Sequence, residues 1–577
     1  MKKSAIALLF AAFLSVSAFA QSVQDGVSHM YAQRYESAKS AFEKLLASNP
    51  NNIEANYWLG QTLIAQKNVA GARSLYEKAL AASNNAPLIQ VGMGHVALLE
   101  GKAAEGRQQF EAAINASRGK KGNDANILNA IGRANVEAYT ESTKAGDLDY
   151  AIAKLNEASQ LAPANSDIFL NLGNAYRKKR DGASGGNAVV AFRKAAELNP
   201  KSGIAPYRTA MLYKTQVNYR QPDAWGVVLE NLNAAVTADP KFAPAYEELY
   251  YYYLLAKKDF AAAETQANQY ISSSDPSVEN DYLKAQTQFV QNKFTEAVAT
   301  AKNIVSQTNN NPKARVFRLL GYSYMGLKDT ATACDFVNQF FTKATEEDII
   351  GEDWILHAQS CGHNNPAIIR ADLAKMLELD SVPARKVAKL REFAKEAKAG
   401  NQRVLEAELN WMSFNIEGSA ANPVRLINDV TLPYYFGGEY LKADSAAKAY
   451  SALAPDSIWG YHWSGLALSA IDTSMEQGLA MPSFEKSLSV AEKDKVRFKS
   501  QGIRAAQMLA VYQYNVKSDK QAALAYATKG LEFDPANAGL LQIKDLSSRS
   551  AAPAKPAAGQ RTNTSSGSGK TGTKASR

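Results

Sequence analysis

Residues 168–176 read IFLNLGNAY. After the glycine of this stretch, Gly173, the chain carries a small residue at Ala188, an aromatic residue at Phe192 and an Asn-Pro pair at residues 199–200. The small residue lets two antiparallel helices approach closely, and the aromatic ring fills the gap between one helical hairpin and the next. The proline ends the second helix, because it cannot continue a helix and restricts the residue before it. The segment is therefore predicted to form a helical hairpin.

The same pattern recurs at a fixed period, which indicates a repeat protein. Glycines follow one another at 34-residue intervals near the N-terminus, and each is followed by a small residue and an aromatic: Gly26, Ala38 and Phe42; Gly60, Ala72 and Tyr76; Gly94, Gly106 and Phe110. A single hairpin cannot bury its own apolar face, whereas stacked neighbours bury it jointly. The abundance of alanine also favours helix, because alanine costs least in a helix interior.

These residues resemble the tetratricopeptide repeat. The stretch at 168–176 is similar to the first helix of that motif, and Ala188, Phe192, Ala195 and Pro200 fall at its second-helix positions. Further units carry the same residue types: Gly132, Ala151, Leu155, Ala158 and Pro163; Val228, Leu232, Ala235 and Pro240; Ala443, Ala447, Tyr450 and Pro455; Ala523, Ala527 and Pro535. The resemblance extends from about Val23 to Leu546. It implies an all-α fold, a right-handed superhelical solenoid of helix-turn-helix hairpins.

The regularity of the spacing divides the chain into segments. Residues 21–343 are predicted to form an N-terminal solenoid, and residues 434–548 form C-terminal helical repeats of the same type. Residues 344–433 keep a helical pattern but lose the repeat spacing, and their turn-forming residues before position 433 suggest a hinge. Residues 549–577 have no aromatic or acidic residue. They are predicted to form a disordered basic tail, because they cannot bury enough apolar surface to offset the entropy of ordering.

Residues 1–20 have the features of a secretory signal peptide. Lys2 and Lys3 supply positive charge, an apolar run follows over residues 5–19, and small residues precede a cleavage point before Gln21. No later apolar run has the length of a membrane-spanning helix, so no transmembrane segment is predicted. The mature protein is expected to be exported to the periplasm or outside the cell.

The sequence shows no arrangement of residues typical of an active site. It has no glycine-rich phosphate loop, no paired-histidine metalloprotease motif and no nucleophile elbow, and it contains only five histidines. We therefore expect a non-enzymatic protein without a cofactor. The net charge of +9 is compatible with an anionic partner, such as an acidic peptide or an envelope polymer. The absence of a basic stripe and the export signal argue against nucleic acid.

The two cysteines are close in sequence to two histidines, in the set Cys334, His357, Cys361 and His363. A disulfide between Cys334 and Cys361 suits an oxidising compartment and an even cysteine count. Two buried free thiols are an alternative of equal weight. A zinc site of two cysteines and two histidines is a third interpretation. Compartment and spacing favour the first two, so no metal is predicted.

The resemblance also assigns residues to a partner-binding groove, because the first helix of each hairpin lines the concave face in this family. The positions are Asn129, Arg133, Asn171, Asn174, Lys178 and Arg208. One subclass of the family clamps a C-terminal carboxylate with Asn, Lys and Arg at such positions. Asn171 and Arg208 match that clamp, whereas Arg133 and Ile204 depart from it. The residues are expected either to hold an acidic peptide through charge-assisted hydrogen bonds or to form a solvated helix face.

The predicted function is a protein-protein interaction scaffold of the bacterial cell envelope that binds a peptide or protein partner in its groove. An alternative is binding of an envelope polymer, peptidoglycan or lipopolysaccharide, through aromatic residues and the basic tail. An enzyme within residues 344–433 is a third class, which the absence of an acid–base arrangement disfavours.

Overall fold

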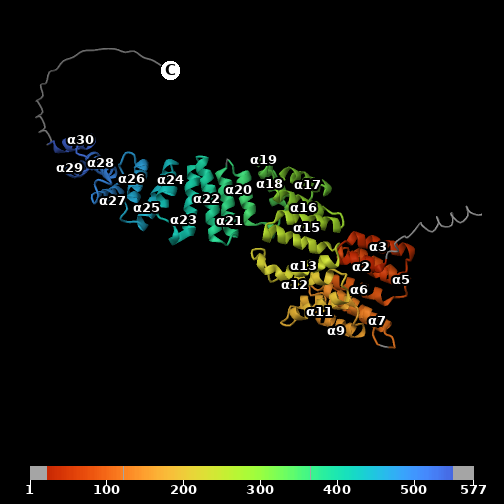
Figure 1. The fold of residues 1–577 in the computed structure, drawn as a ribbon. Coiled ribbons are helices and arrows are strands. Elements are labelled where there is room, and N and C mark those ends of the chain that lie inside the picture. The colour runs from red at the N-terminus through yellow and green to blue at the C-terminus, as the bar shows by residue number, and fades with distance from the viewer. Residues whose placement is uncertain (1–21, 121, 364, 550–577) are drawn as a thin grey trace, which may run out of the picture. The chain divides into compact units, whose positions relative to one another are not determined.

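A computed structural model describes residues 22–120, 122–363 and 365–549 (Figure 1). In these residues the chain forms α-helices joined by short turns, without a β-strand, as predicted. The predicted signal peptide and all but the first residue of the predicted tail lie outside the described residues. The chain divides between Asp348 and Ile349 into two compact units, which are described separately. The boundaries expected at residues 343 and 433 stay predictions.

The first unit is a series of antiparallel helix pairs. In chain order the helices are α2 (Val23–Tyr31), α3 (Tyr35–Ser48), α4 (Ile53–Ala65), α5 (Val69–Ala82), α6 (Pro87–Leu99), α7 (Ala103–Ser117), α8 (Ala125–Ala138), α9 (Leu148–Leu161), α10 (Ser166–Lys179), α11 (Ser184–Leu198), α12 (Ile204–Lys214), α13 (Gly226–Ala238), α14 (Ala243–Tyr251), α15 (Phe260–Ser273), α16 (Val278–Val290), α17 (Phe294–Gln307), α18 (Ala314–Gly326) and α19 (Thr330–Lys343). Each even-numbered helix up to α12 packs on the next in the chain, which gives the hairpins that the repeat spacing predicts.

The glycine and the aromatic of each repeat meet inside one hairpin. A Cβ atom at Gly60 would lie 2.1 Å from Cζ of Tyr76, and one at Gly173 would lie 2.5 Å from Cδ1 of Phe192. The sequence had placed these rings between neighbouring hairpins. That expectation is only partly right, because each ring lies against its own first helix, and Tyr76 also reaches Gly92 of the next hairpin. The glycine is needed because the ring occupies the space of a side chain.

The first hairpin closes the curved unit by packing against much later repeats. Ala32, in the turn between α2 and α3, is 1% exposed and belongs to one apolar cluster with residues of α10, α12 and α14. Arg34 donates hydrogen bonds to the carbonyls of Lys241 and Ser273, and Asp275 accepts from the backbone N–H of Glu36 at 2.8 Å. The concave face of this unit is therefore partly filled by the chain's own first hairpin.

The second unit contains α20 (Gly351–Cys361), α21 (Pro366–Leu379), α22 (Pro383–Ala399), α23 (Arg403–Glu417), α24 (Leu432–Phe436), α25 (Tyr440–Leu453), α26 (Ile458–Ile471), α27 (Met481–Ala491), α28 (Lys499–Asn515), α29 (Lys520–Leu531) and α30 (Ala538–Ser548). Helical pairing continues through the region without clear repeats, where α22 packs on α23. A π-helical segment at Leu426–Thr431 precedes α24, and both pack on α23. The hinge expected in this stretch stays a prediction.

Candidate functional site

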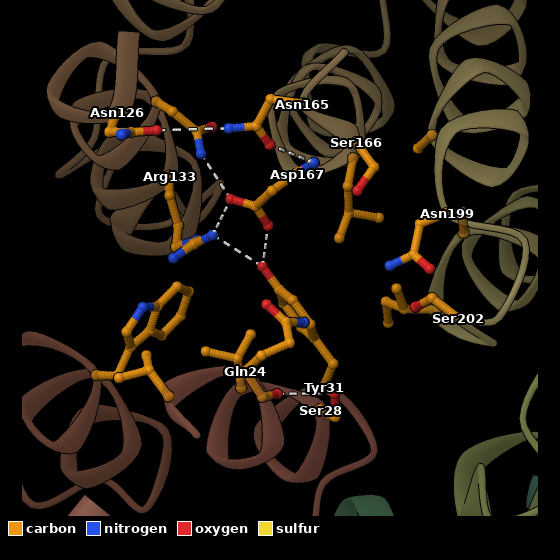
Figure 2. Close-up of a pocket in the computed structure, with 18 of the residues that line it drawn as sticks. Gln24, Ser28, Tyr31, Asn126, Arg133, Asn165, Ser166, Asp167, Asn199 and Ser202 are labelled. Carbon is orange, nitrogen blue, oxygen red and sulfur yellow. Dashed lines mark hydrogen bonds and ion pairs between the residues drawn. The ribbon is translucent and has the colours of Figure 1, made fainter. Parts of the chain in front are cut away.

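A hydrogen-bonded network around Asp167 joins α2, α8 and α10 of the first unit (Figure 2). The amide of Asn129 donates to the Asp167 carboxylate at 2.6 Å, and the amide of Asn171 donates to it at 3.1 Å. Arg133 forms an ion pair with the same carboxylate. The hydroxyl of Tyr31 donates to Asp167 and accepts from Arg133 at 2.8 Å. Figure 2 shows Arg133, Tyr31 and Asp167 converging on one point.

The helix backbone sets this arrangement. On α8, Asn129 and Arg133 are one turn apart and share a helix face. On α10, Asp167 and Asn171 have the same spacing. The side chain of Asn165 caps α10 by accepting a hydrogen bond from the backbone N–H of Asp167 at 3.0 Å. This cap fixes the first turn of α10 and with it the carboxylate of Asp167.

The charges of the network are balanced inside the protein. Arg133 is only 2% exposed. Burial is the largest single influence and lowers the pKa of Arg133, but the Asp167 carboxylate together with Tyr31, Tyr57 and Glu137 outweighs it and holds this pKa above its ordinary value. The Arg133 guanidinium also lies over Trp58, with 4.1 Å between Cζ and the ring centroid. Burial raises the pKa of Tyr31, so its hydroxyl keeps the proton that it donates to Asp167.

Three of the predicted groove residues, Asn129, Arg133 and Asn171, are thus brought together around a carboxylate. The carboxylate belongs to Asp167 of the same chain and not to a partner. Asp167 was missed in the sequence, although its place one turn before Asn171 on the same helix face was a usable signal. Tyr31 had no such signal, because it lies 136 residues from Asp167.

The other predicted residues lie further along α10 and on α12. Lys178 donates to the carbonyls of Val136 at 2.6 Å and Tyr139 at 2.8 Å, at the end of α8. Lysine commonly bonds to the free carbonyls at a helix C-terminus. Asn174 has a buried Oδ1 atom that accepts no hydrogen bond from any residue within the described ranges. Lys178 therefore ties α10 to α8, while Asn174 keeps an unused acceptor.

Two arginines form a cationic part of this face. In the part of the chain that the structure describes, the Nε atoms of Arg208 and Arg177 are buried and have no hydrogen-bond partner. Burial, followed by the positive charges of Arg208 and Arg180, lowers the pKa of Arg177. Burial also lowers the pKa of Lys178; Glu137 opposes this, and Arg177 and Arg208 add to it. Arg177 was not predicted, although it directly precedes Lys178.

A pocket of about 660 Å³ lies beside the Asp167 network. It is bounded by α2 on one side and by the first turns of α8, α10 and α12 on the other (Figure 2). Hydroxyl and amide side chains make up much of its wall: Gln24, Ser28, Asn126, Ser166, Asn199 and Ser202. Tyr57 and Arg133 also line it. The pocket depends on the closure of the first hairpin, which supplies one of its walls.

The repeats of this fold match a known family. Residues 25–87, which include most of α2–α5, match the family model described as Tetratricopeptide repeat. These residues are identified as tetratricopeptide repeats. No curated protein sequence matches it.

Several solved structures are similar to this protein. The C-terminal part of a repeat protein from Cytophaga hutchinsonii is 20% identical over 45% of this chain and 98% of its own, with a TM-score of 0.25. A tetratricopeptide repeat protein from Parabacteroides merdae is 18% identical over 49% and 98%, with a TM-score of 0.28. Yeast Tom70 is 13% identical over 67% and 96%, with a TM-score of 0.26. At these identities the similarity is one of fold alone.

The two cysteines of the chain lie on separate units. Cys334 is on α19 of the first unit and Cys361 ends α20 of the second. Their pairing stays a prediction. His357 is hydrogen-bonded to Asp372, with 2.7 Å between Nδ1 and Oδ2. Across the described ranges, no three His, Cys, Asp or Glu residues gather in a way that could hold a metal ion.

Among the helices of the described residues, none combines the length and the apolar character needed to span a bilayer.

Proposed function

We propose that this tetratricopeptide repeat protein is a non-enzymatic interaction scaffold of the bacterial cell envelope, and that it binds an acidic peptide or protein segment on the concave face of its first unit. The observation that supports this function best is the pair Arg177 and Arg208. Their Nε atoms are buried and lack hydrogen-bond partners among the residues described. A signal-peptide-like N-terminus supports the envelope location.

Arg177 and Arg208 favour binding of an anion because an unpaired, half-buried cation is energetically unfavourable. Removing guanidinium groups from water without pairing them is unfavourable, and two neighbouring positive charges repel each other. A carboxylate bound between Arg177 and Arg208 would relieve both effects through charge-assisted, bidentate hydrogen bonds. Glu137 is the acidic neighbour of this cluster. Its single negative charge does not cancel the positive charges of Arg177, Arg208 and Lys178, so this face keeps a net positive charge.

The network of Asn129, Arg133 and Asn171 contributes to this function indirectly. These side chains already hold the carboxylate of Asp167, and Arg133 is nearly fully buried. Their role is therefore to fix α8 against α10 and to present the arginines further along the groove. A charge reversal at Arg133 would report on folding and not on partner binding.

Binding of an envelope polymer is the alternative, and the second unit carries one observation in its favour. The rings of Phe436 and Trp463 are 6.4 Å apart, and those of Trp459 and His462 are also 6.4 Å apart. Phe436 is 66% exposed and Trp459 is 39% exposed. Exposed aromatic rings can stack on sugar rings of a polymer. The basic tail that would assist them lies outside the described residues.

A direct binding measurement tests the acidic-partner proposal. Fluorescently labelled hexaglutamate is titrated with the mature protein and followed by anisotropy. The double variant Arg177→Glu/Arg208→Glu is expected to bind about tenfold or more weakly, because each charge-assisted contact is worth roughly 1.5–3 kcal/mol. Raising the salt concentration should weaken wild-type binding as well.

The matched control reverses two exposed charges on α11, in Arg193→Glu/Lys194→Glu. This variant has the same net charge as the first but leaves the groove intact, so its affinity should stay near that of the wild type. Equal weakening in both variants would show that only net charge matters, and that the groove is not the binding site.

A further inference from the structure

The turn between α2 and α3 is held on later repeats of the first unit by one arginine, Arg34. Its Nη1 atom donates to the backbone carbonyl of Lys241, in the turn before α14, and to that of Ser273, at the end of α15, at 3.3 Å. Its Nε atom donates to Nδ1 of His29 at 2.8 Å. The guanidinium therefore connects three segments of the unit, and His29 is the acceptor that orients it.

A carboxylate completes this contact. Asp275, in the turn between α15 and α16, accepts hydrogen bonds from the backbone N–H groups of Glu36 at 2.8 Å and Ser37 at 3.3 Å, and from the hydroxyl of Ser37. These N–H groups lie in the first turn of α3, where no carbonyl of the helix can accept from them. Arg34, the residue before α3, provides no side-chain cap. Asp275 therefore caps α3 from a distant repeat and complements the positive end of its dipole.

The hydrogen bond between His29 and Arg34 requires a neutral histidine. An arginine side chain only donates hydrogen bonds, so Nδ1 of His29 must accept with its lone pair. The imidazole then carries its one proton on Nε2. A second proton, on Nδ1, would remove the acceptor and would place two N–H groups against each other. It would also add a positive charge next to the guanidinium of Arg34.

The electrostatic surroundings of His29 disfavour that second proton. The charged groups that face this contact come from α2, from the turn that follows it and from the turns before α14 and α16: Asp25, Arg34, Asp239, Lys241 and Asp275. Burial, followed by the charge of Arg34, lowers the pKa of His29. Lys241 adds to this effect, whereas Asp275 and Asp25 oppose it without cancelling it. Asp25 lies one turn earlier on the same helix, so its attraction does not depend on the contact with the later repeats.

We propose that His29, Arg34 and Asp275 form an acid-sensitive latch, which releases the α2–α3 turn from the turns before α14 and α16 when His29 is protonated. In the released turn His29 is hydrated, and its pKa returns toward the ordinary value of about 6.5. Because this pKa is lower in the closed state, the released state binds the proton more readily. The latch is therefore closed most firmly above about pH 6.5, and closure weakens as the pH falls below that value.

The release concerns one edge of the first hairpin. Val27 of α2 and Phe42 of α3 share an apolar cluster with Leu59 of α4, and the latch residues do not belong to it. The hairpin therefore stays packed on the next repeat when the turn is released. Ala32 of the turn packs in the apolar cluster of α10, α12 and α14, so its departure uncovers part of the concave face. No partner takes part, and the latch does not depend on the function proposed above.

Hydrogen exchange of the mature protein, followed by mass spectrometry, tests the latch through the amides of Glu36 and Ser37. Asp275 is the acceptor for both N–H groups, so their protection depends on the closed latch. Protection is compared at about pH 7.5 and about pH 5.5, on either side of the ordinary histidine pKa, after correction for the intrinsic effect of pH on exchange. We expect these two amides to lose protection at the lower pH, while the buried helix α6 stays protected at both.

Two variants and a control isolate the role of His29. His29→Gln keeps an acceptor for Arg34 but cannot be protonated, so Glu36 and Ser37 should be protected at both pH values. Arg34→Ala should leave them unprotected at both. His363→Gln removes an exposed histidine of the second unit and should behave as the wild type. The proposal is overturned if the wild type stays protected at the lower pH, if His29→Gln keeps the wild-type loss of protection, or if Arg34→Ala stays protected. Loss of protection in α6 together with the latch would show general unfolding and would overturn it as well.

Discussion

Replacing Arg133 with glutamate is expected to lower the free energy of unfolding of the first unit by about 3–5 kcal/mol, the usual effect of breaking a buried ion pair. The substitution removes the partner of Asp167 and puts a second carboxylate next to it, in a place that is almost fully buried. It also removes the hydrogen bond to Tyr31 that ties the first hairpin to α8. Urea unfolding followed by circular dichroism measures the change.

The control for this variant is Arg180→Glu, at the C-terminal end of α10 in the next repeat. Arg180 forms an ion pair with Glu141 at 2.6 Å, but the two side chains are 71% and 69% exposed. Solvent screens such pairs, so this charge reversal should change stability little. A loss of stability as large in Arg180→Glu as in Arg133→Glu would mean that net charge, and not the Asp167 network, holds the unit together.

Phe192→Ala should destabilise the first unit by about 3–5 kcal/mol, the range for removing a fully buried phenylalanine. The Phe192 ring is 0% exposed and occupies the space that the missing side chain of Gly173 leaves. Alanine would leave a cavity between α10 and α11 that neither helix backbone can fill. Because these helices carry Asp167, Arg177 and the rim of the pocket, ligand binding should weaken as well. Thermal unfolding measures the loss.

Phe260→Ala is the matched control for this effect. Phe260 begins α15 and is 39% exposed, so its truncation removes the same atoms without leaving an enclosed cavity. Only a small change in melting temperature is expected. If Phe192→Ala and Phe260→Ala have the same melting temperature, the glycine–aromatic contact does not stabilise the hairpin as described.

The fold could be predicted from sequence because its determinants are local. The glycine and the aromatic of a repeat, such as Gly60 and Tyr76 or Gly173 and Phe192, lie within one hairpin and recur with similar spacing. A short segment of sequence is therefore enough to predict the hairpin that it forms. The helix pairs of the first unit follow directly from this pattern. What the pattern could not show is how far the unit curves. The contacts that close it, such as Arg34 with Ser273, join residues 239 positions apart.

The candidate site was predicted only in part for the same reason. Asn129, Arg133 and Asn171 face one another because the repeat places them on neighbouring first helices. The sequence does not show that Asp167 satisfies them, since spacing assigns a residue to a helix face but not to a partner. Arg177 and Arg208 stand out only once burial and hydrogen bonding are known. The pocket has no sequence signal, because its walls come from distant repeats.

Hydrogen exchange of the mature protein with and without hexaglutamate tests the central claim, that an acidic partner binds the concave face of the first unit. The account predicts slower exchange in α10 and α12, around Arg177 and Arg208, with little change in the helix between them, α11. Protection confined to the second unit, or to α11 with none in α10 and α12, would contradict it.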